Sequence, residues 1–227
     1  MFFILPWKLR QKHSASQGGY PVANVALIAL NVLVYLLGWS WVVGQGTGLL
    51  SILMYGFCHV RLWHLLLNMW ALWVFGNPVN RRLGNGFYLL AYLGSIVTIG
   101  LLARFVLDGG LVGSSGALFA VIAMALLLMP AAALEVGCVA LFPLTVVVGL
   151  LAKPKQAYQW IARWAVFSIP ALWCLLLIPL MQLWSFFWSG WSWGPAAHLL
   201  GMMCGVAAVL MLPTRITMRR RSVADMV

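Results

Sequence analysis

Residues 112–129 read VGSSGALFAVIAMALLLM, and this stretch decides the fold because it nearly spans a bilayer and contains no charged residue. A helix needs about 20 apolar residues to cross the hydrocarbon core of a membrane. Ser115 lies near the start of the stretch, and polar side chains within a membrane are costly and mark functional sites. The stretch predicts a transmembrane helix with a polar group of functional interest near one end.

The composition of the whole chain points to a lipid environment. Of the 227 residues, 64% are apolar and only 7% are charged, whereas a soluble domain carries roughly 25% charged residues. A chain this poor in charge cannot cover a surface that faces water, so lipid must be its solvent. We expect one membrane domain and no second folded domain.

The net charge of +11 could indicate a nucleic-acid partner. The basic residues, however, lie in short clusters between apolar runs, as they do in loops that follow the positive-inside rule. No basic face with stacking aromatic rings exists apart from the membrane spans. We expect no nucleic-acid partner, and the lipid bilayer is the first partner that the sequence predicts.

The cysteines and histidines do not predict a metal or haem site. The four cysteines share no close spacing and resemble small buried side chains. They are Cys58, Cys138, Cys174 and Cys204. A membrane haem or metal protein that uses the histidines stays a lesser alternative, because their helical spacing and the lack of Cys or acid ligands argue against it. We expect no cofactor and no metal.

Membrane topology follows from the positions of the charges. Seven apolar stretches cover residues 22–43, 56–75, 86–106, 112–130, 134–151, 164–184 and 194–212. If residues 134–151 do not cross, all of the 14 Lys and Arg residues except Arg61 and Arg104 face the cytoplasm. That stretch contains Glu135 and Pro143, which suit an interfacial or re-entrant segment. We predict an all-α bundle of six transmembrane helices with both termini cytoplasmic; seven crossings are the alternative.

The chain then divides into three parts. Residues 1–21 are expected to form a cytoplasmic N-terminal segment, residues 22–212 the membrane domain, and residues 213–227 a basic cytoplasmic tail. The first seven residues are too short for a signal-peptide core and suit an anchor at the membrane surface. Residues 185–193 form an external loop rich in aromatic residues, either a belt at the headgroups or a mobile gate.

Ser115 and His198 are the candidate nucleophile and base. With six spans, both of their helices run inward from the outer face, so the two side chains lie at a similar depth. Ser115 falls in the first turn of its helix, where a backbone N–H is free and the helix dipole is positive. A serine hydroxyl is a weak nucleophile until a base removes its proton, and His198 is the only candidate base nearby. Taken alone, a serine at position 115 could instead cap the helix or serve as a small residue in helix packing.

His64 and Asn68 are candidate donors to an oxyanion. They lie four residues apart and share one helix face, with His64 about eight residues into its helix. Both side chains can donate hydrogen bonds to a developing negative charge; interhelical hydrogen bonding is the alternative. His59 projects roughly 140° away around the same helix, by the 3.6-residue turn, and we expect it to hold the first external loop.

The acids offer no third member for a catalytic triad. Glu135 and Asp225 are cytoplasmic in the six-span topology, and Asp108 is expected as a solvated acid of an external loop. The residues therefore predict a Ser–His dyad, a variant of the triad arrangement.

Small residues would let the two candidate helices approach each other. One helix carries Gly113, Gly116 and further small residues, and the last helix carries Gly201 and Gly205 at a GxxxG spacing. Phe119, one turn below Ser115, could stack on the His198 ring. GxxxG packing without any chemistry is the alternative.

Several ordered motifs resemble those of the rhomboid intramembrane serine proteases. They are Phe57-x-His59 with His64-Leu65-x-x-Asn68-Met69, Phe75-Gly76 with Leu83-Gly84, Gly113-x-Ser115-Gly116 with Phe119, and Ala197-His198-x-x-Gly201-x-x-x-Gly205. The resemblance covers roughly residues 20–212. The chain departs from the family in its first external loop, which lacks a Trp-Arg pair, and at Asn80, where an acid is common. The stretch before the fifth core helix is also unusually long.

The resemblance implies a six-helix core with a water-filled pocket. Ser115 would be the nucleophile and His198 the base, and His64, Asn68 and the Ser115 backbone would form the oxyanion hole. The implied substrates are transmembrane proteins, cleaved in or near their membrane segments, in a bacterial inner membrane. A non-catalytic rhomboid-like protein that binds or escorts membrane clients is the alternative function. The sequence leaves the oligomeric state open.

Overall fold

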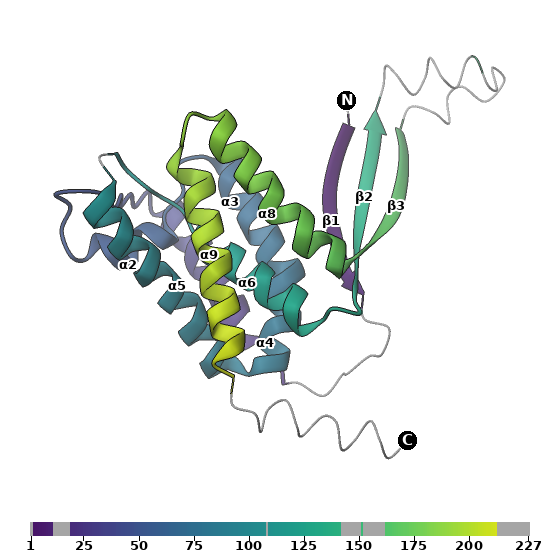
Figure 1. The fold of residues 1–227 in the computed structure, drawn as a ribbon, viewed down its shortest axis with the longest axis horizontal. Coiled ribbons are helices and arrows are strands. Elements are labelled where there is room, and N and C mark those ends of the chain that lie inside the picture. The colour runs from purple at the N-terminus through teal and green to yellow at the C-terminus, as the bar shows by residue number, and fades with distance from the viewer. Residues whose placement is uncertain (1, 11–18, 108, 142–150, 152–161, 213–227) are drawn as a thin grey trace.

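The computed structural model describes residues 2–10, 19–107, 109–141, 151 and 162–212, which form a helical bundle with a small antiparallel sheet beside it (Figure 1). The elements in chain order are β1 (Phe2–Arg10), α1 (Val22–Leu36), α2 (Ser51–Met54), η1 (Tyr55–Phe57), α3 (Leu62–Ala71), η2 (Leu72–Gly76), α4 (Asn77–Leu83), α5 (Asn85–Val106), α6 (Ser115–Leu128), β2 (Ala133–Leu141), β3 (Ala162–Pro170), α8 (Ala171–Trp188) and α9 (Trp193–Leu210).

Three helices of the described chain, α5, α8 and α9, are long and apolar enough to cross a membrane. The helices α1 and α6 are apolar but shorter. The helix α3 runs through the π-helical turn η2 directly into α4. The predicted spans over residues 86–106, 112–130 and 194–212 agree with α5, α6 and α9 to within a few residues. The first span ends earlier than predicted, at Leu36, where Gly38 turns the chain with a φ of +67°.

The helix α6 lies at the centre of the bundle and contacts α3, α4, α5, α8 and α9 (Figure 1). Residues from Gly116 to Leu126 are buried except for the half-buried Phe119. A helix that is apolar on every side belongs in the interior of a protein or a membrane. The stretch quoted first in the sequence therefore forms the core around which the other helices pack.

Glycines bring the backbones of α6 and α9 into contact. A Cβ atom added to Gly201 would lie 1.9 Å from the Gly116 carbonyl oxygen, and one added to Gly205 would lie 2.3 Å from that of Ala120. Both contacts advance by four residues in the same direction, so the two helices run parallel. The predicted close approach through small residues is confirmed, and the N-termini of both helices lie at one end of the bundle.

An uncharged network joins α1, α4 and α5 at the opposite end. The Asn24 amide donates to the Leu72 carbonyl, which belongs to the π turn, and accepts from the Tyr88 hydroxyl. Asn80 accepts a hydrogen bond from the Asn24 backbone N–H at 2.9 Å and donates one to Asn85 at 2.9 Å. A carboxylate in place of Asn80 could accept but not donate. The amide thus suits this site.

The sheet overturns the all-α expectation for three segments. The strand β2 pairs antiparallel with β1 on one side and β3 on the other, and Arg10 forms a 3.2 Å ion pair with Glu135. The segment over residues 134–151 therefore begins as a strand, and its residues 142–150 lie outside the described chain. The predicted helix over residues 164–184 begins only at Ala171, after Pro170.

Sequence reasoning missed these strands because a short apolar run fits a buried strand as well as a helix. Val166, Phe167 and Ile169 of β3 are β-branched or aromatic residues, which favour strands. The first residues of the chain, expected as a surface anchor, instead form β1. The basic tail predicted for residues 213–227 lies outside the described residues.

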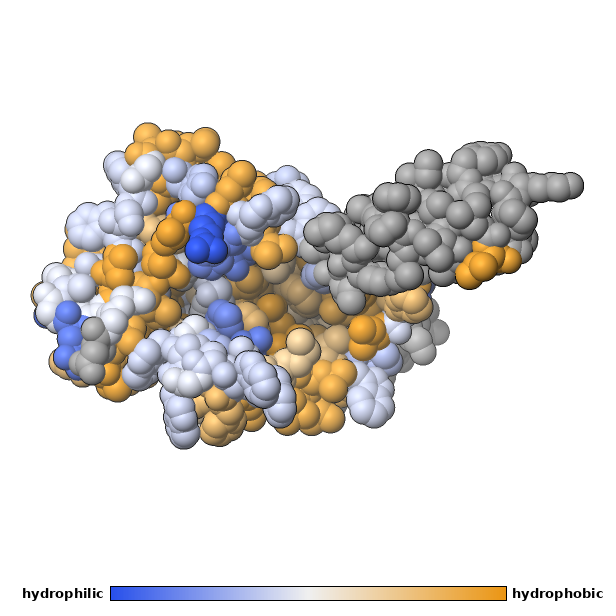
Figure 2. All heavy atoms as spheres, turned by 90° about the horizontal axis from the view of Figure 1, so that it is seen from above, coloured by the Kyte–Doolittle hydropathy of each residue, from blue (hydrophilic) through white to orange (hydrophobic). Residues whose placement is uncertain are grey.

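The outer surface of the bundle is apolar. Most large side chains of α8 point outward, including Trp173 at 58%, Met181 at 65% and Trp188 at 80% exposure. Figure 2, seen from above, shows that the end of the bundle is also largely hydrophobic or weakly polar, with only small hydrophilic patches. Such a surface is suited to lipid rather than water.

Replacing Gly201 with Ala should separate α6 from α9. The new methyl group would overlap the Gly116 carbonyl oxygen, and backbone atoms cannot rotate away. We expect a loss of about 1–3 kcal/mol of stability, measured as a lower midpoint of thermal unfolding in detergent. Gly94→Ala is the matched control, because its Cβ meets nothing within 4 Å. Equal midpoints for the two variants would contradict the contact.

Candidate active site

Ser115 is the first residue of α6. Gly113, two residues earlier, has a φ of +116°, and its backbone N–H donates to the Tyr55 carbonyl at 2.9 Å. This turn lets the chain enter the helix directly at Ser115. The Ser115 N–H belongs to the first turn, where intrahelical acceptors are missing. It is therefore available for a ligand or a developing negative charge.

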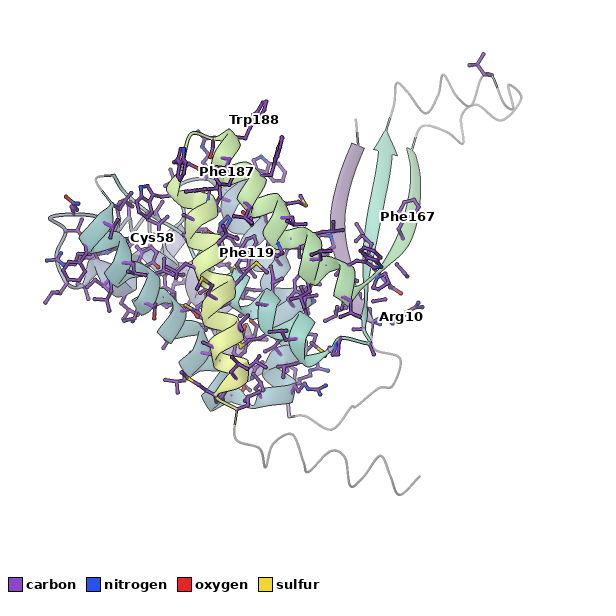
Figure 3. The ribbon with its side chains drawn as sticks, viewed as in Figure 1. Arg10, Cys58, Phe119, Phe167, Phe187 and Trp188 are labelled. Carbon is purple, nitrogen blue, oxygen red and sulfur yellow. The ribbon has the colours of Figure 1, made fainter. Side chains whose placement is uncertain are left out.

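His198 is the sixth residue of α9, and two contacts hold its ring. The Phe119 ring of α6 stacks on it with centroids 4.1 Å apart and planes 9° from parallel. Figure 3 shows Phe119 inside the bundle, where α6 lies behind α9. The second contact joins His198 Nδ1 to Gln182 Oε1 of α8 at 2.9 Å. The predicted Phe119 stacking is thus present.

The bond to Gln182 determines which ring nitrogen carries the proton. The Oε1 atom is a carbonyl oxygen and can only accept, so Nδ1 must donate. In the neutral imidazole, Nε2 then has the free lone pair. A ring held in this state can receive a proton at Nε2.

Ser115 and His198 lie at the same end of the α6–α9 contact. A Cβ on Gly116, the residue after Ser115, would lie 3.4 Å from the carbonyl oxygen of Ala197, the residue before His198. Within the described residues, no hydrogen bond joins the Ser115 hydroxyl to the His198 ring. Catalytic hydrogen bonds are often long before substrate binds. The arrangement therefore holds the two groups near each other without a formed proton-transfer contact.

His64 reaches the site from α3. It is the third residue of this helix, not about the eighth as expected, because α3 begins at Leu62. A Cβ on Gly113 would lie 2.6 Å from His64 Cε1, so the imidazole rests on the turn that leads to Ser115.

His59 occupies a different place from the one expected. It precedes α3 and therefore does not follow the helical spacing that predicted it to point away. Its Nε2 lies 3.0 Å from the Asn68 amide nitrogen and 3.2 Å from Ser114 Oγ. Its ring also meets His64 edge-on at 5.0 Å. His59 thus orients Asn68 beneath the start of α6.

Asn68 keeps the capacity to bind a further group. Its side-chain nitrogen has two hydrogens, and one is engaged by His59. The buried network of His59, Asn68 and Ser114 therefore fixes the amide and leaves one donor. Among the residues that the structure describes, no three His, Cys, Asp or Glu side chains are grouped to hold a metal ion. Asp108 lies outside these residues.

Sequence reasoning missed Gln182. The only signal was the one amide side chain in a mostly apolar helix, and its partner is on another helix. The aromatic loop also differs from expectation, since α8 continues to Trp188 and only residues 189–192 connect it to α9. Figure 3 shows Phe187 and Trp188 at that end of α8.

An apolar cavity of about 620 Å³ lies between α8 and α9. Leu183 and Leu199, the residues directly after Gln182 and His198, line the cavity together with Pro179, Met203 and Ala123. The hydrogen bond between the two helices is therefore adjacent to an apolar space.

The fold and these residues define a membrane protein of the rhomboid class. A sequence profile of the Rhomboid domain matches residues 46–215, and the chain belongs to this family. It is 32% identical over 168 residues to "Rhomboid protein 1, mitochondrial" of Saccharomyces cerevisiae (strain ATCC 204508 / S288c). The match covers 70% of this chain and 41% of the yeast protein. The chain is accordingly an integral membrane protein.

Replacing Gly113 with Ala should displace His64. The methyl group would meet the end of the imidazole, and the φ of +116° is strained for any residue with a side chain. If Ser115 is the nucleophile and His64 a donor to its oxyanion, as the sequence predicts, labelling of Ser115 by a serine-directed fluorophosphonate should slow about tenfold or more, because one such donor contributes at least that factor to the rate. Gly109→Ala is the control in the same loop, because its nearest contact is at 3.9 Å. Unchanged labelling of the Gly113 variant would contradict a role for this contact.

Proposed function

We propose that this chain is an intramembrane serine endopeptidase that cleaves transmembrane proteins by a Ser115–His198 dyad. The observation that supports it most is the parallel contact of α6 and α9, which brings the start of the Ser115 helix and the His198 ring to one end. The free Nε2 of His198 adds a proton acceptor. Family membership supports the same class of reaction.

In the proposed reaction the Ser115 oxygen attacks the scissile carbonyl carbon while His198 Nε2 takes the hydroxyl proton. The carbonyl oxygen becomes an oxyanion, for which the Ser115 N–H, Asn68 and His64 are the proposed donors. Collapse breaks the C–N bond, and the imidazolium gives its proton to the leaving amine. Water, deprotonated by His198, then hydrolyses the acyl-enzyme and releases Ser115.

The proposed topology has six spans: α1, the continuous α3–η2–α4 segment, α5, α6, α8 and α9. Both termini would be cytoplasmic, with Ser115 and His198 toward the opposite face. The parallel course of α6 and α9 supports it, because a single crossing by residues 134–151 would set these helices antiparallel. We propose an inner-membrane location, bacterial as the sequence suggested; the mitochondrial name of the yeast relative makes the corresponding organelle membrane the alternative.

A non-catalytic protein that binds membrane clients is the second candidate. The absence of a hydrogen bond between Ser115 and His198 in the described structure favours it. The two functions differ in one property, because only the protease must react at Ser115.

Replacing Ser115 with Ala should abolish cleavage of a co-expressed reporter transmembrane protein, since the nucleophile is lost. Cleavage is measured by the appearance of the shorter fragment at equal levels of membrane-inserted protein. Ser40→Ala, at an exposed loop serine, should cleave as the unmodified chain does. Full cleavage by the Ser115 variant would contradict the proposal and favour the binding function.

Replacing Asn68 with Ala should slow cleavage by about 100-fold or more, the usual cost of one oxyanion donor. The variant also loses the bond to His59, so the midpoint of thermal unfolding should fall slightly. Turnover in purified protein at saturating substrate separates the two effects. A variant with full turnover would exclude Asn68 from the oxyanion site.

A further inference from the structure

Gln182 is placed to act on the His198 ring. It is half-buried on α8, the most exposed of the three long apolar helices, and its side-chain carbonyl accepts the Nδ1–H of His198 at 2.9 Å. Its neighbours Met181 and Leu183 are apolar and exposed. Placing a polar side chain in such a helix costs free energy. The one hydrogen bond described for Gln182 therefore indicates that this side chain has a specific function.

We propose that Gln182 is a positioning residue that completes a Ser–His–Gln arrangement, which rests on the proposed protease function. The amide oxygen holds the proton on Nδ1 and so makes Nε2 the base for Ser115. A neutral imidazole has two tautomers, and only the one with a free Nε2 can take the serine proton in this geometry. Gln182 selects that tautomer.

The two contacts of the His198 ring restrict different motions. Stacking on Phe119 fixes the plane of the ring but allows a half-turn about the Cβ–Cγ bond, which keeps the plane and exchanges Nδ1 with Cδ2. The hydrogen bond from Nδ1 to Gln182 opposes this half-turn, because a flipped ring would place a carbon atom against the amide oxygen. Phe119 and Gln182 come from α6 and α8, so the ring is fixed only when both helices are packed against α9.

Among the described residues, no carboxylate is free to accept the Nδ1–H of His198, and the amide oxygen of Gln182 accepts it instead. Glu135 is engaged with Arg10 in the sheet, and Asp108 and Asp225 lie outside the described residues. A carboxylate would also cost more to place in an apolar environment than a neutral amide does. Among the described residues, the place of the acid in a conventional triad is thus taken by a neutral amide, which suits the membrane.

The test compares three purified variants by their rate of labelling with a fluorophosphonate and by their turnover of a reporter transmembrane substrate. Gln182→Leu removes the acceptor, and we expect labelling and kcat to fall about tenfold or more, with KM unchanged, because the base adopts the wrong tautomer. Gln182→Glu keeps an acceptor oxygen and should restore most of the rate; because the position is half-buried, the cost of the charge should appear in the midpoint of thermal unfolding instead. Met181→Leu, the neighbouring exposed position on the same helix, should behave as the unmodified chain.

Two results would overturn this inference without affecting the proposed function. One is labelling of Gln182→Leu at the rate of the unmodified chain. The other is equally slow labelling of Gln182→Glu and Gln182→Leu, with the midpoint of thermal unfolding lowered in both. The latter would show a structural role only. If the unmodified chain neither labels nor cleaves, the proposed function fails and this inference fails with it. Labelling of the unmodified chain therefore separates the two failures.

Discussion

The backbone contact between α6 and α9 is the constraint on which the site depends. Gly201 lies against the Gly116 carbonyl, and Gly205 lies against that of Ala120, at distances that exclude any side chain. In a membrane the hydrophobic effect does not drive helices together, so close packing between small residues must do so. This contact sets the depth and direction of both helices. The positions of Ser115 and His198 follow from it.

Other elements attach to this pair from both sides. The helix α3 contributes His64, which rests on the Gly113 turn, and the loop before it contributes His59, which orients Asn68. On the other side α8 contributes Gln182. The site is therefore assembled from four helices and the loop before α3. A shift of α8 away from α9 would leave the stacking of Phe119 on His198 intact. It would break the hydrogen bond that the Nδ1–H of His198 donates to Gln182.

The sequence alone predicts those features of the candidate site that lie within a single helix. Ser115, His198 and the GxxxG spacing on the last helix were visible because polar groups in apolar runs and small residues at a helical period are rare signals. His59 was misplaced because the start of α3 lies after it, where Arg61 is still extended. The strands were missed because apolar length does not distinguish a strand from a helix. Gln182 needed the tertiary structure, since its partner lies on another helix.

The network around Asn24 and Asn80 has one more consequence. All of its members are amides, a phenol and backbone groups, so it carries no net charge at neutral pH. Because none of these groups changes its charge near neutral pH, the end of the bundle farthest from the candidate site keeps its hydrogen bonds when the acidity around it changes.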